Sequence, residues 1–138
     1  MGFDFGEKLI GVAIGNTLTA SARPLQSVRA ERREAKFDAI GQLIAQWEPV
    51  QLVVGLPLSR EGEEQLRTTQ ARRFANQLHG RFGLPVLPCD ERLSSVAAEA
   101  ELSSAGVKHW RERKSVLDAV AARLILQTFL DDLRHDRT

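Results

Sequence analysis

The sequence predicts an α/β fold with a mixed β-sheet, antiparallel on one side and parallel on the other, and helices on both faces. Two observations carry this prediction. The first 28 residues show short apolar runs separated by turn signals, and the rest of the chain alternates helical periodicity with further short apolar runs. Strands that first follow one another and then alternate with helices give the order β-β-β-α-β-α-β-α-α, which builds a sheet of mixed direction.

Three strands are predicted at the start of the chain. The middle strand is predicted over residues 8–14, a short apolar run rich in β-branched side chains. Residues 3–6 before it form the first strand, and residues 18–28 after it, in which apolar and polar residues alternate in part, form the third. Turn-forming residues occupy positions 5–8 and 15–16. Short turns between successive strands indicate a three-stranded antiparallel meander.

The pattern then changes to helical spacing. From Glu34, apolar side chains recur at every third or fourth residue as far as Trp47, which predicts a helix with one apolar face, and Pro49 ends it. Residues 51–55 are a continuous apolar run closed by a glycine, the pattern of a strand that is buried on both faces.

The second half of the chain continues this alternation. A helix is predicted over residues 66–81 and a short strand over residues 84–89, whose two prolines favour the edge of the sheet. A helix of small residues is expected at 94–104, a basic connection at 106–114, and the strongest helix of the chain at 115–134.

Length and composition limit the possible functions. A chain of 138 residues supports one core, so residues 1–138 are expected to form a single domain. The net charge of +1 does not indicate a nucleic-acid-binding protein, so charges for such a partner would have to be arranged locally. Cys89 is the only cysteine, which excludes an intramolecular disulfide, and its apolar neighbours indicate a small buried side chain. Without an apolar run of about 20 residues or the pattern of a signal peptide, we expect a cytoplasmic protein with no membrane contact.

Three acidic residues occupy unusual positions. Asp4 lies inside an apolar strand pattern, where Asp is unfavourable, and Glu91 follows the last predicted strand directly. Asp118 shares the apolar face of the final helix with Ala122 and Ile125, so its carboxylate is expected to point toward the sheet. A charge in that place needs a counter-charge or a metal ion. If the sheet brings the three acids together, their oxygen-only ligand set suits Mg²⁺ or Mn²⁺ and not zinc.

Each acid also has a simpler interpretation. Residues 115–118 fit a capping box, in which Asp118 would only satisfy the start of a helix. Asp90 and Glu91 could stabilise the helix predicted from residue 94 through its dipole, and Asp4 could be a solvated residue near the chain end. All three explanations would have to hold at once for the acidic pattern to be a coincidence.

Basic residues form three local groups. Residues 29–33 and the arginines of the helix over 66–81 are interpreted as solvated faces, the first group because glutamates are interleaved with it. Residues 108–114 differ, because Trp110 stands among cations just before Asp118. Cations for phosphates and an aromatic ring for stacking suit single-stranded or distorted nucleic acid, although an exposed loop would explain the same residues.

Four short motifs occur in order along nearly the whole chain. They read Asp4-Phe5-Gly6-x-Lys8-x-x-Gly11-Val12-Ala13, Val54-Gly55-Leu56-Pro57, Asp90-Glu91-Arg92-Leu93-Ser94 and Arg113-Lys114-x-x-x-Asp118-x-x-Ala121-Ala122. In this combination the chain resembles the YqgF family of bacterial proteins, which are pre-16S ribosomal RNA nucleases or Holliday-junction-resolvase-like proteins. The resemblance implies a ribonuclease-H-like fold with a mixed five-stranded sheet, in agreement with the predicted element order.

The resemblance also implies a function. The acidic positions of the family fall on Asp4, Glu91 and Asp118, which would be the catalytic residues and the ligands of Mg²⁺ or Mn²⁺ in an endonuclease that hydrolyses phosphodiester bonds. The expected substrate is structured RNA, at the 5′ end of pre-16S ribosomal RNA, free or on the ribosome. Nucleic-acid binding is expected from six residues: Lys8, Arg92, Lys108, Trp110, Arg113 and Lys114.

Two alternatives stay open. One is a resolvase that cuts four-way DNA junctions, and the other is a non-catalytic RNA- or ribosome-associated binding module. The turn at residues 4–6 is also similar to the phosphate-binding hairpin of actin-like ATPases, but those enzymes need two such domains and this chain supplies one. The chain is expected to be a monomer or a weak homodimer.

Two departures from the family pattern bear on these expectations. Relatives usually carry more apolar residues before the first Asp, whereas three residues precede Asp4 here, so its strand is expected to be short. The loop after Pro57 usually reads close to Asp-Gly-x-Glu. Here it reads Glu61-Gly62-Glu63-Glu64, an acidic loop whose role is left open.

Overall fold

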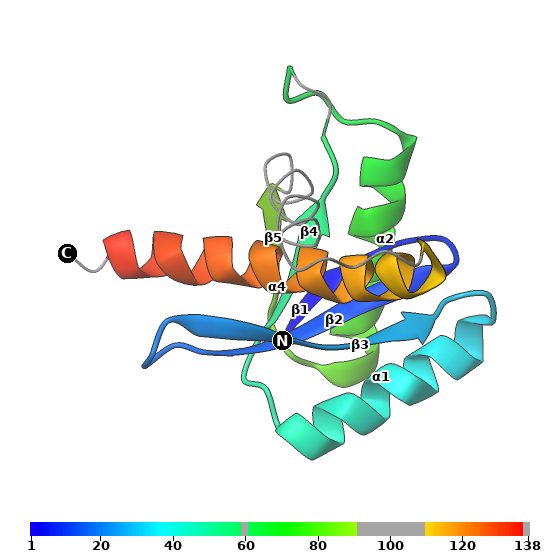
Figure 1. Cartoon of the computed structure of the whole chain (residues 1–138), viewed down its shortest axis with the longest axis horizontal. Coiled ribbons are helices and arrows are strands. Elements are labelled where there is room, and N and C mark those ends of the chain that lie inside the picture. The colour runs from blue at the N-terminus through cyan, green and yellow to red at the C-terminus, as the bar shows by residue number, and fades with distance from the viewer. Residues whose placement is uncertain (59–60, 91–109, 137–138) are drawn as a thin grey trace.

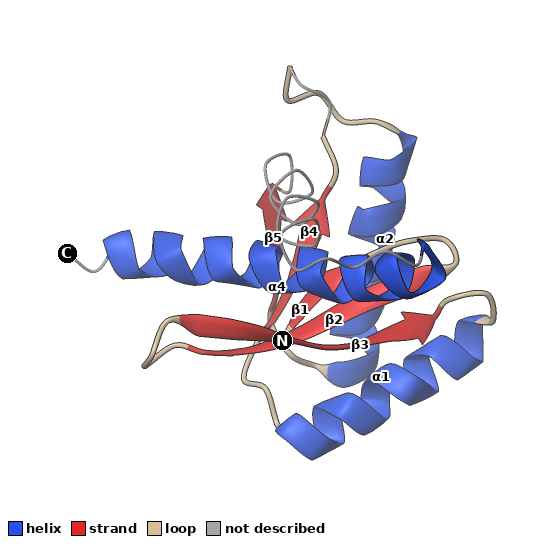
Figure 2. Ribbon diagram, in the orientation of Figure 1, coloured by secondary structure: helices blue, strands red, loops and turns tan. Residues whose placement is uncertain are grey.

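The computed structural model describes residues 1–58, 61–90 and 110–136, which form one sheet with helices on both faces (Figure 1). The five strands lie in the order β3-β2-β1-β4-β5, so β1 is central (Figure 2). In chain order the elements are β1 (Gly2–Asp4), β2 (Leu9–Asn16), β3 (Ser21–Arg29), α1 (Arg33–Trp47), β4 (Leu52–Leu56), α2 (Leu66–Phe82), β5 (Val86–Asp90) and α4 (Trp110–Asp136). The predicted helix at 94–104 lies outside the described residues.

The first three strands form the predicted antiparallel meander. β1 pairs with β2, and β2 pairs with β3. The turn predicted at residues 15–16 is wrong, because both residues belong to β2 and the chain turns at residues 17–20. There the side-chain oxygen of Asn16 accepts a hydrogen bond from the Leu18 N–H at 2.7 Å, which closes an Asx turn.

The other half of the sheet is parallel, as predicted. β1 pairs with β4, and β4 pairs with β5, which forms the edge of the sheet. Helix α1 ends at Trp47, before Pro49, and Glu48 closes it in a left-handed conformation with φ of 49°. The helices between the parallel strands therefore begin and end close to the predicted positions.

Alternation along the strands divides their side chains between two cores. Phe3 and Val54 point to the face covered by α1 and α2, where they join Phe74 in the larger core. Val53 points to the opposite face and packs with Ile125 of α4 in a smaller core. In Figure 1, α4 accordingly crosses in front of the strands, and α2 passes behind them.

Helix α4 is longer than predicted. It begins at Trp110 rather than near residue 115, so the end of the expected basic connection is helical. The first five residues of the helix include two arginines, a glutamate and a lysine, all of which favour helices, and no proline or glycine interrupts them. Within the part of the chain that the structure describes, no helix is long and apolar enough to cross a membrane.

Candidate functional site

The carboxyl ends of three parallel strands lie side by side at one end of the sheet. β1 ends at Asp4, β4 at Leu56 and β5 at Asp90. Because β1 pairs with β2 on one side and with β4 on the other, the strand order reverses at β1. In open α/β sheets, the carboxyl ends of strands at such a switch point line a crevice in which ligands bind. Asp4 therefore stands where this class of fold places a ligand.

Gly11 brings helix α4 against this end of the sheet. It lies opposite Asp4 in the pairing of β1 with β2, so the two residues face the same side of the sheet. On that side, α4 approaches so closely that a methyl group at position 11 would lie 1.8 Å from the backbone oxygen of Asp118. Asp118 is therefore next to the residue that faces Asp4.

The side chain of Asp118 lies on the sheet side of α4. It is half-buried, and its Oδ2 atom exposes less than 1 Å². Ala122 and Ile125, one and two turns further along, are buried as the spacing predicts. The capping-box interpretation of Asp118 is wrong, because α4 begins eight residues earlier and residues 115–118 lie beyond its first turn.

The third predicted acid, Glu91, lies outside the described residues and follows Asp90, the last residue of β5. Among the residues whose placement is described, no three His, Cys, Asp or Glu side chains gather into a metal-binding group. Asp4 and Asp118 offer oxygen ligands, which fits Mg²⁺ or Mn²⁺ and does not fit zinc. Cys89 is half-buried, with its Sγ 3.6 Å from the backbone oxygen of Ile125.

The predicted nucleic-acid-binding residues fall in two described places. Lys8 is exposed in the turn between β1 and β2. The first turns of α4 contain three others: Trp110, Arg113 and Lys114. The β1–β2 turn and the start of α4 lie at the same end of the molecule (Figure 1). The remaining two, Arg92 and Lys108, lie outside the described residues.

The loop after β4 is fixed by α2. Thr68 is fully buried, and its hydroxyl group donates a hydrogen bond to the backbone oxygen of Pro57. The same oxygen atom of Thr68 accepts a hydrogen bond from the Gln65 N–H at 3.1 Å. Glu64, one of the acids of this loop, forms an exposed ion pair with Arg72. The structure thus assigns Glu64 a local contact on the surface.

Sequence reasoning missed a group of cations on the face opposite α4. Arg33 and Lys36 from α1 line one pocket together with Arg73 from α2. The interpretation of these arginines as separate solvated faces is incomplete, because the packing of the two helices brings them together. One signal was present in the sequence: Lys36 and Arg73 each directly precede an aromatic residue of the larger core, Phe37 and Phe74.

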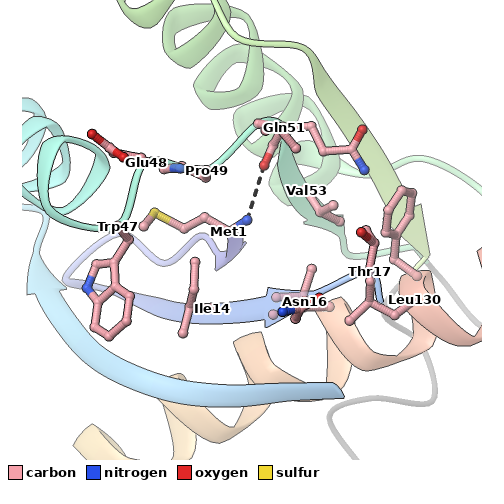
Figure 3. A pocket seen from close by; sticks show the side chains of 14 residues that line it. Met1, Ile14, Asn16, Thr17, Trp47, Glu48, Pro49, Gln51, Val53 and Leu130 are labelled. Atoms are coloured by element: carbon pink, nitrogen blue, oxygen red, sulfur yellow. Dashed lines mark hydrogen bonds between the residues drawn. The ribbon is translucent and has the colours of Figure 1, made fainter. Parts of the chain in front are cut away.

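Another pocket lies at the opposite end of β1. Its walls include Met1, Trp47 and Leu130 (Figure 3). The Met1 ammonium group donates a hydrogen bond to the backbone oxygen of Gln51 at 3.1 Å, and burial lowers the pKa of this amine to about 6. Leu130 is twelve residues beyond Asp118, about 18 Å along the helix axis. This pocket is therefore separate from the end of the sheet at which Asp4 and Asp118 lie, which is called the acidic edge below.

Known proteins resemble this chain over nearly its whole length. The family described as "RuvX: Holliday junction resolvase" matches residues 1–132. Relatives from Burkholderia ambifaria (strain MC40-6) and Burkholderia cenocepacia (strain HI2424), both named "Putative pre-16S rRNA nuclease", are 56% identical over 133 residues, which covers 96% of this chain and 89% of each relative. The structure of T. thermophilus RuvC in complex with a Holliday junction substrate shares 18% identity and a TM-score of 0.53, and the match covers 97% of this chain and 94% of that one. This likeness confirms the expected ribonuclease-H-like fold.

Proposed function

Because this chain belongs to the RuvX (YqgF) family, we propose that it is a metal-dependent endonuclease that processes the 5′ end of pre-16S ribosomal RNA. The names of the family and of its Burkholderia relatives both describe enzymes that cut phosphodiester bonds. The observation that carries the proposal is the contact of Asp118 with Gly11, the residue opposite Asp4. This contact supports an acidic site made by residues that are far apart in the sequence.

In this proposal, Asp4, Glu91 and Asp118 hold Mg²⁺ or Mn²⁺. When bound, the ion acts as a Lewis acid that stabilises negative charge on the phosphodiester group. The chain itself orients the ligands. Asp4 is fixed at the end of the central strand, and Asp118 is fixed by a helix that packs directly on that sheet. Ligands held in this way need little reorganisation during the reaction.

Residues around the acidic edge would bind the rest of the substrate. Lys8, Arg113 and Lys114 are proposed to neutralise phosphates, and Trp110 to stack on a base. Arg92 and Lys108 are proposed to add to the same surface. The position of Lys8 and of the first turns of α4 at one end of the molecule supports this assignment. We propose structured RNA, free or on the ribosome, as the partner and the cytoplasm as the place of action, where a single cysteine stays reduced.

The test is a cleavage panel with Mn²⁺ on pre-16S rRNA, single-stranded RNA, duplex DNA and a four-way junction. Asp4→Asn and Asp118→Asn remove a proposed ligand with little change in side-chain size, and each is expected to slow cleavage by at least about 100-fold. Asp132→Asn is the matched control, because Asp132 is an exposed acid on the same helix, and it should cleave like the wild type. Wild-type rates for both Asp4→Asn and Asp118→Asn would rule out the acidic site.

The description of the family favours a second candidate, a resolvase of four-way DNA junctions. The same panel distinguishes the RNA nuclease from the resolvase. A resolvase cuts two strands of the junction at symmetric positions and leaves the RNA intact. A wild-type protein that binds RNA but cleaves no substrate in the panel would instead be a non-catalytic RNA-binding module.

A further inference from the structure

Three cations surround a pocket on the face of the sheet opposite α4. The pocket has a volume of about 310 Å³ and lies between the turn after β1, the start of α1 and the middle of α2. Arg33 and Arg73 are exposed at its walls, and Lys36 is half-buried. The ring of Phe5 stacks on Phe74 with a centroid distance of 4.9 Å, and the Lys36 Nζ atom lies 5.7 Å from the centre of the Phe5 ring. The pocket therefore joins an apolar wall to cationic side chains.

The charges of these cations act on one another. Among the ion pairs between described residues, none involves Arg33, Lys36 or Arg73. Burial first, and then the charges of Arg33, Arg81 and Arg73, hold the pKa of Lys36 below its usual value. Two exposed carboxylates, those of Glu7 and Glu31, also line the pocket. An anion in the pocket would relieve the repulsion among the cations.

The pocket adjoins the acidic edge of the sheet. Phe5 follows Asp4 directly, so their Cα atoms are about 3.8 Å apart. Asp4 faces α4, whereas the ring of Phe5 packs on the side of α1 and α2. A nucleic-acid strand rises about 3.4 Å per nucleotide. A strand that crosses the end of β1 would therefore pass from Asp4 to the pocket within a few nucleotides.

We propose that this pocket binds the phosphodiester backbone of the nucleic-acid substrate, a few nucleotides from the cleaved bond. Arg33, Lys36 and Arg73 are the phosphate ligands, and Phe5 separates the pocket from the acidic edge. The proposal rests on the nuclease function proposed above, because it needs a polyanionic substrate that reaches Asp4. It adds a second contact, on the far side of β1, to the contacts expected from α4.

The experiment measures equilibrium binding of a labelled pre-16S rRNA fragment by fluorescence anisotropy in EDTA, over a range of salt concentrations. Arg33→Gln and Arg73→Gln change exposed side chains, so both variants should fold. Each is expected to weaken binding by about three- to tenfold and to lower the slope of log Kd against log salt by about 1. Arg72→Gln is the matched control: it removes the same charge from the same helix, at a residue that pairs with Glu64 outside the pocket.

The outcomes separate this proposal from the nuclease function. Weaker binding by Arg33→Gln and Arg73→Gln, with Arg72→Gln within about twofold of the wild type, supports the pocket. Equal losses in all three variants would show a general effect of charge and overturn it. If the wild type cleaves pre-16S rRNA and the two pocket variants bind normally, the pocket alone is wrong. A wild type that neither binds nor cleaves any nucleic acid would overturn both proposals.

Discussion

Asp118 keeps a carboxylate oxygen away from solvent while its backbone presses on Gly11. The acid at position 4 faces the same side of the sheet, and carboxylates that come together without a metal ion repel one another. We therefore expect Asp4→Asn and Asp118→Asn to leave the Tm in metal-free buffer unchanged or to raise it, as measured by calorimetry. Added Mn²⁺ should raise the Tm of the wild type more than that of either variant, because only the wild type keeps all ligands. A fall of several degrees in metal-free buffer would mean that the carboxylate stabilises the fold.

Lys36 provides a prediction about pH. Its lowered pKa reflects burial and the neighbouring cations, whereas a bound phosphate would raise the pKa of the same ammonium group. Binding then favours the protonated form, so affinity for an oligonucleotide should be full below the pKa of free Lys36 and fall as the pH rises from there through the higher pKa of the bound form. The titration is best done with DNA, which resists alkali. In Lys36→Arg, the side chain stays charged, so the fall should be smaller than in the wild type. An equal fall in both proteins would exclude Lys36 as the titrating group.

The packing of helix α4 on the sheet depends on glycines in the strands beneath it. Gly11 lies under Asp118, and Gly2 and Gly15 lie under Leu126. Gly11→Ala would force α4 away from β2, so we expect a loss of about 1–3 kcal/mol in the free energy of unfolding together with a large loss of cleavage. Gly80→Ala is the control, because nothing lies within 4 Å of that position in α2. That variant should be neutral or slightly more stable. Normal stability of Gly11→Ala would contradict the close contact.

The connection between β4 and α2 depends on Thr68. Its hydroxyl group is fully buried. It donates a hydrogen bond to the backbone oxygen of Pro57 and accepts one from the N–H of Gln65. Thr68→Val keeps the shape and leaves both backbone groups without this partner, so chemical denaturation should show a loss of about 1–3 kcal/mol. Thr69→Val, at the exposed neighbouring position, should change stability by less than about 0.5 kcal/mol. Equal effects of the two substitutions would show that the hydrogen bonds of the Thr68 hydroxyl group contribute little to stability.

The elements could be predicted because alternation and helical spacing report burial directly. One error occurs where a residue type has two structural uses. The sequence pattern at Gly15 predicts a turn, but Gly15 permits the close approach of Leu126 and Leu130 from α4, and both uses favour glycine. The acids at positions 4 and 118 could be proposed as a site because each breaks an apolar pattern. Arg33 and Arg73 break no pattern, and only the packing of α1 against α2 brings them to one pocket.

For the whole molecule, a net charge of +1 conceals an uneven distribution. Lys8 lies in the turn that follows β1, and the cationic pocket begins at Phe5 in the same turn. Basic residues of the first turns of α4 are placed at the same end (Figure 1). Local concentration of charge raises the affinity for a polyanion even when the total is near neutral. The nearly balanced composition is therefore compatible with a nucleic-acid partner.

The exposed apolar side chains lead to a prediction of the oligomeric state, which bears on the choice between RNA and a DNA junction. Among the described residues, the exposed large apolar side chains stand on separate segments: Leu18, Val50, Leu66 and Leu87. Obligate dimers bury on the order of 2,000 Å² or more in apolar interfaces, so we expect sedimentation velocity to show mainly a species of 15.3 kDa. A resolvase must cut two strands symmetrically and should form a stable two-fold dimer. A stable dimer that cuts four-way junctions and spares pre-16S rRNA would therefore overturn the proposed substrate, whereas a monomer that cuts the RNA would exclude the resolvase.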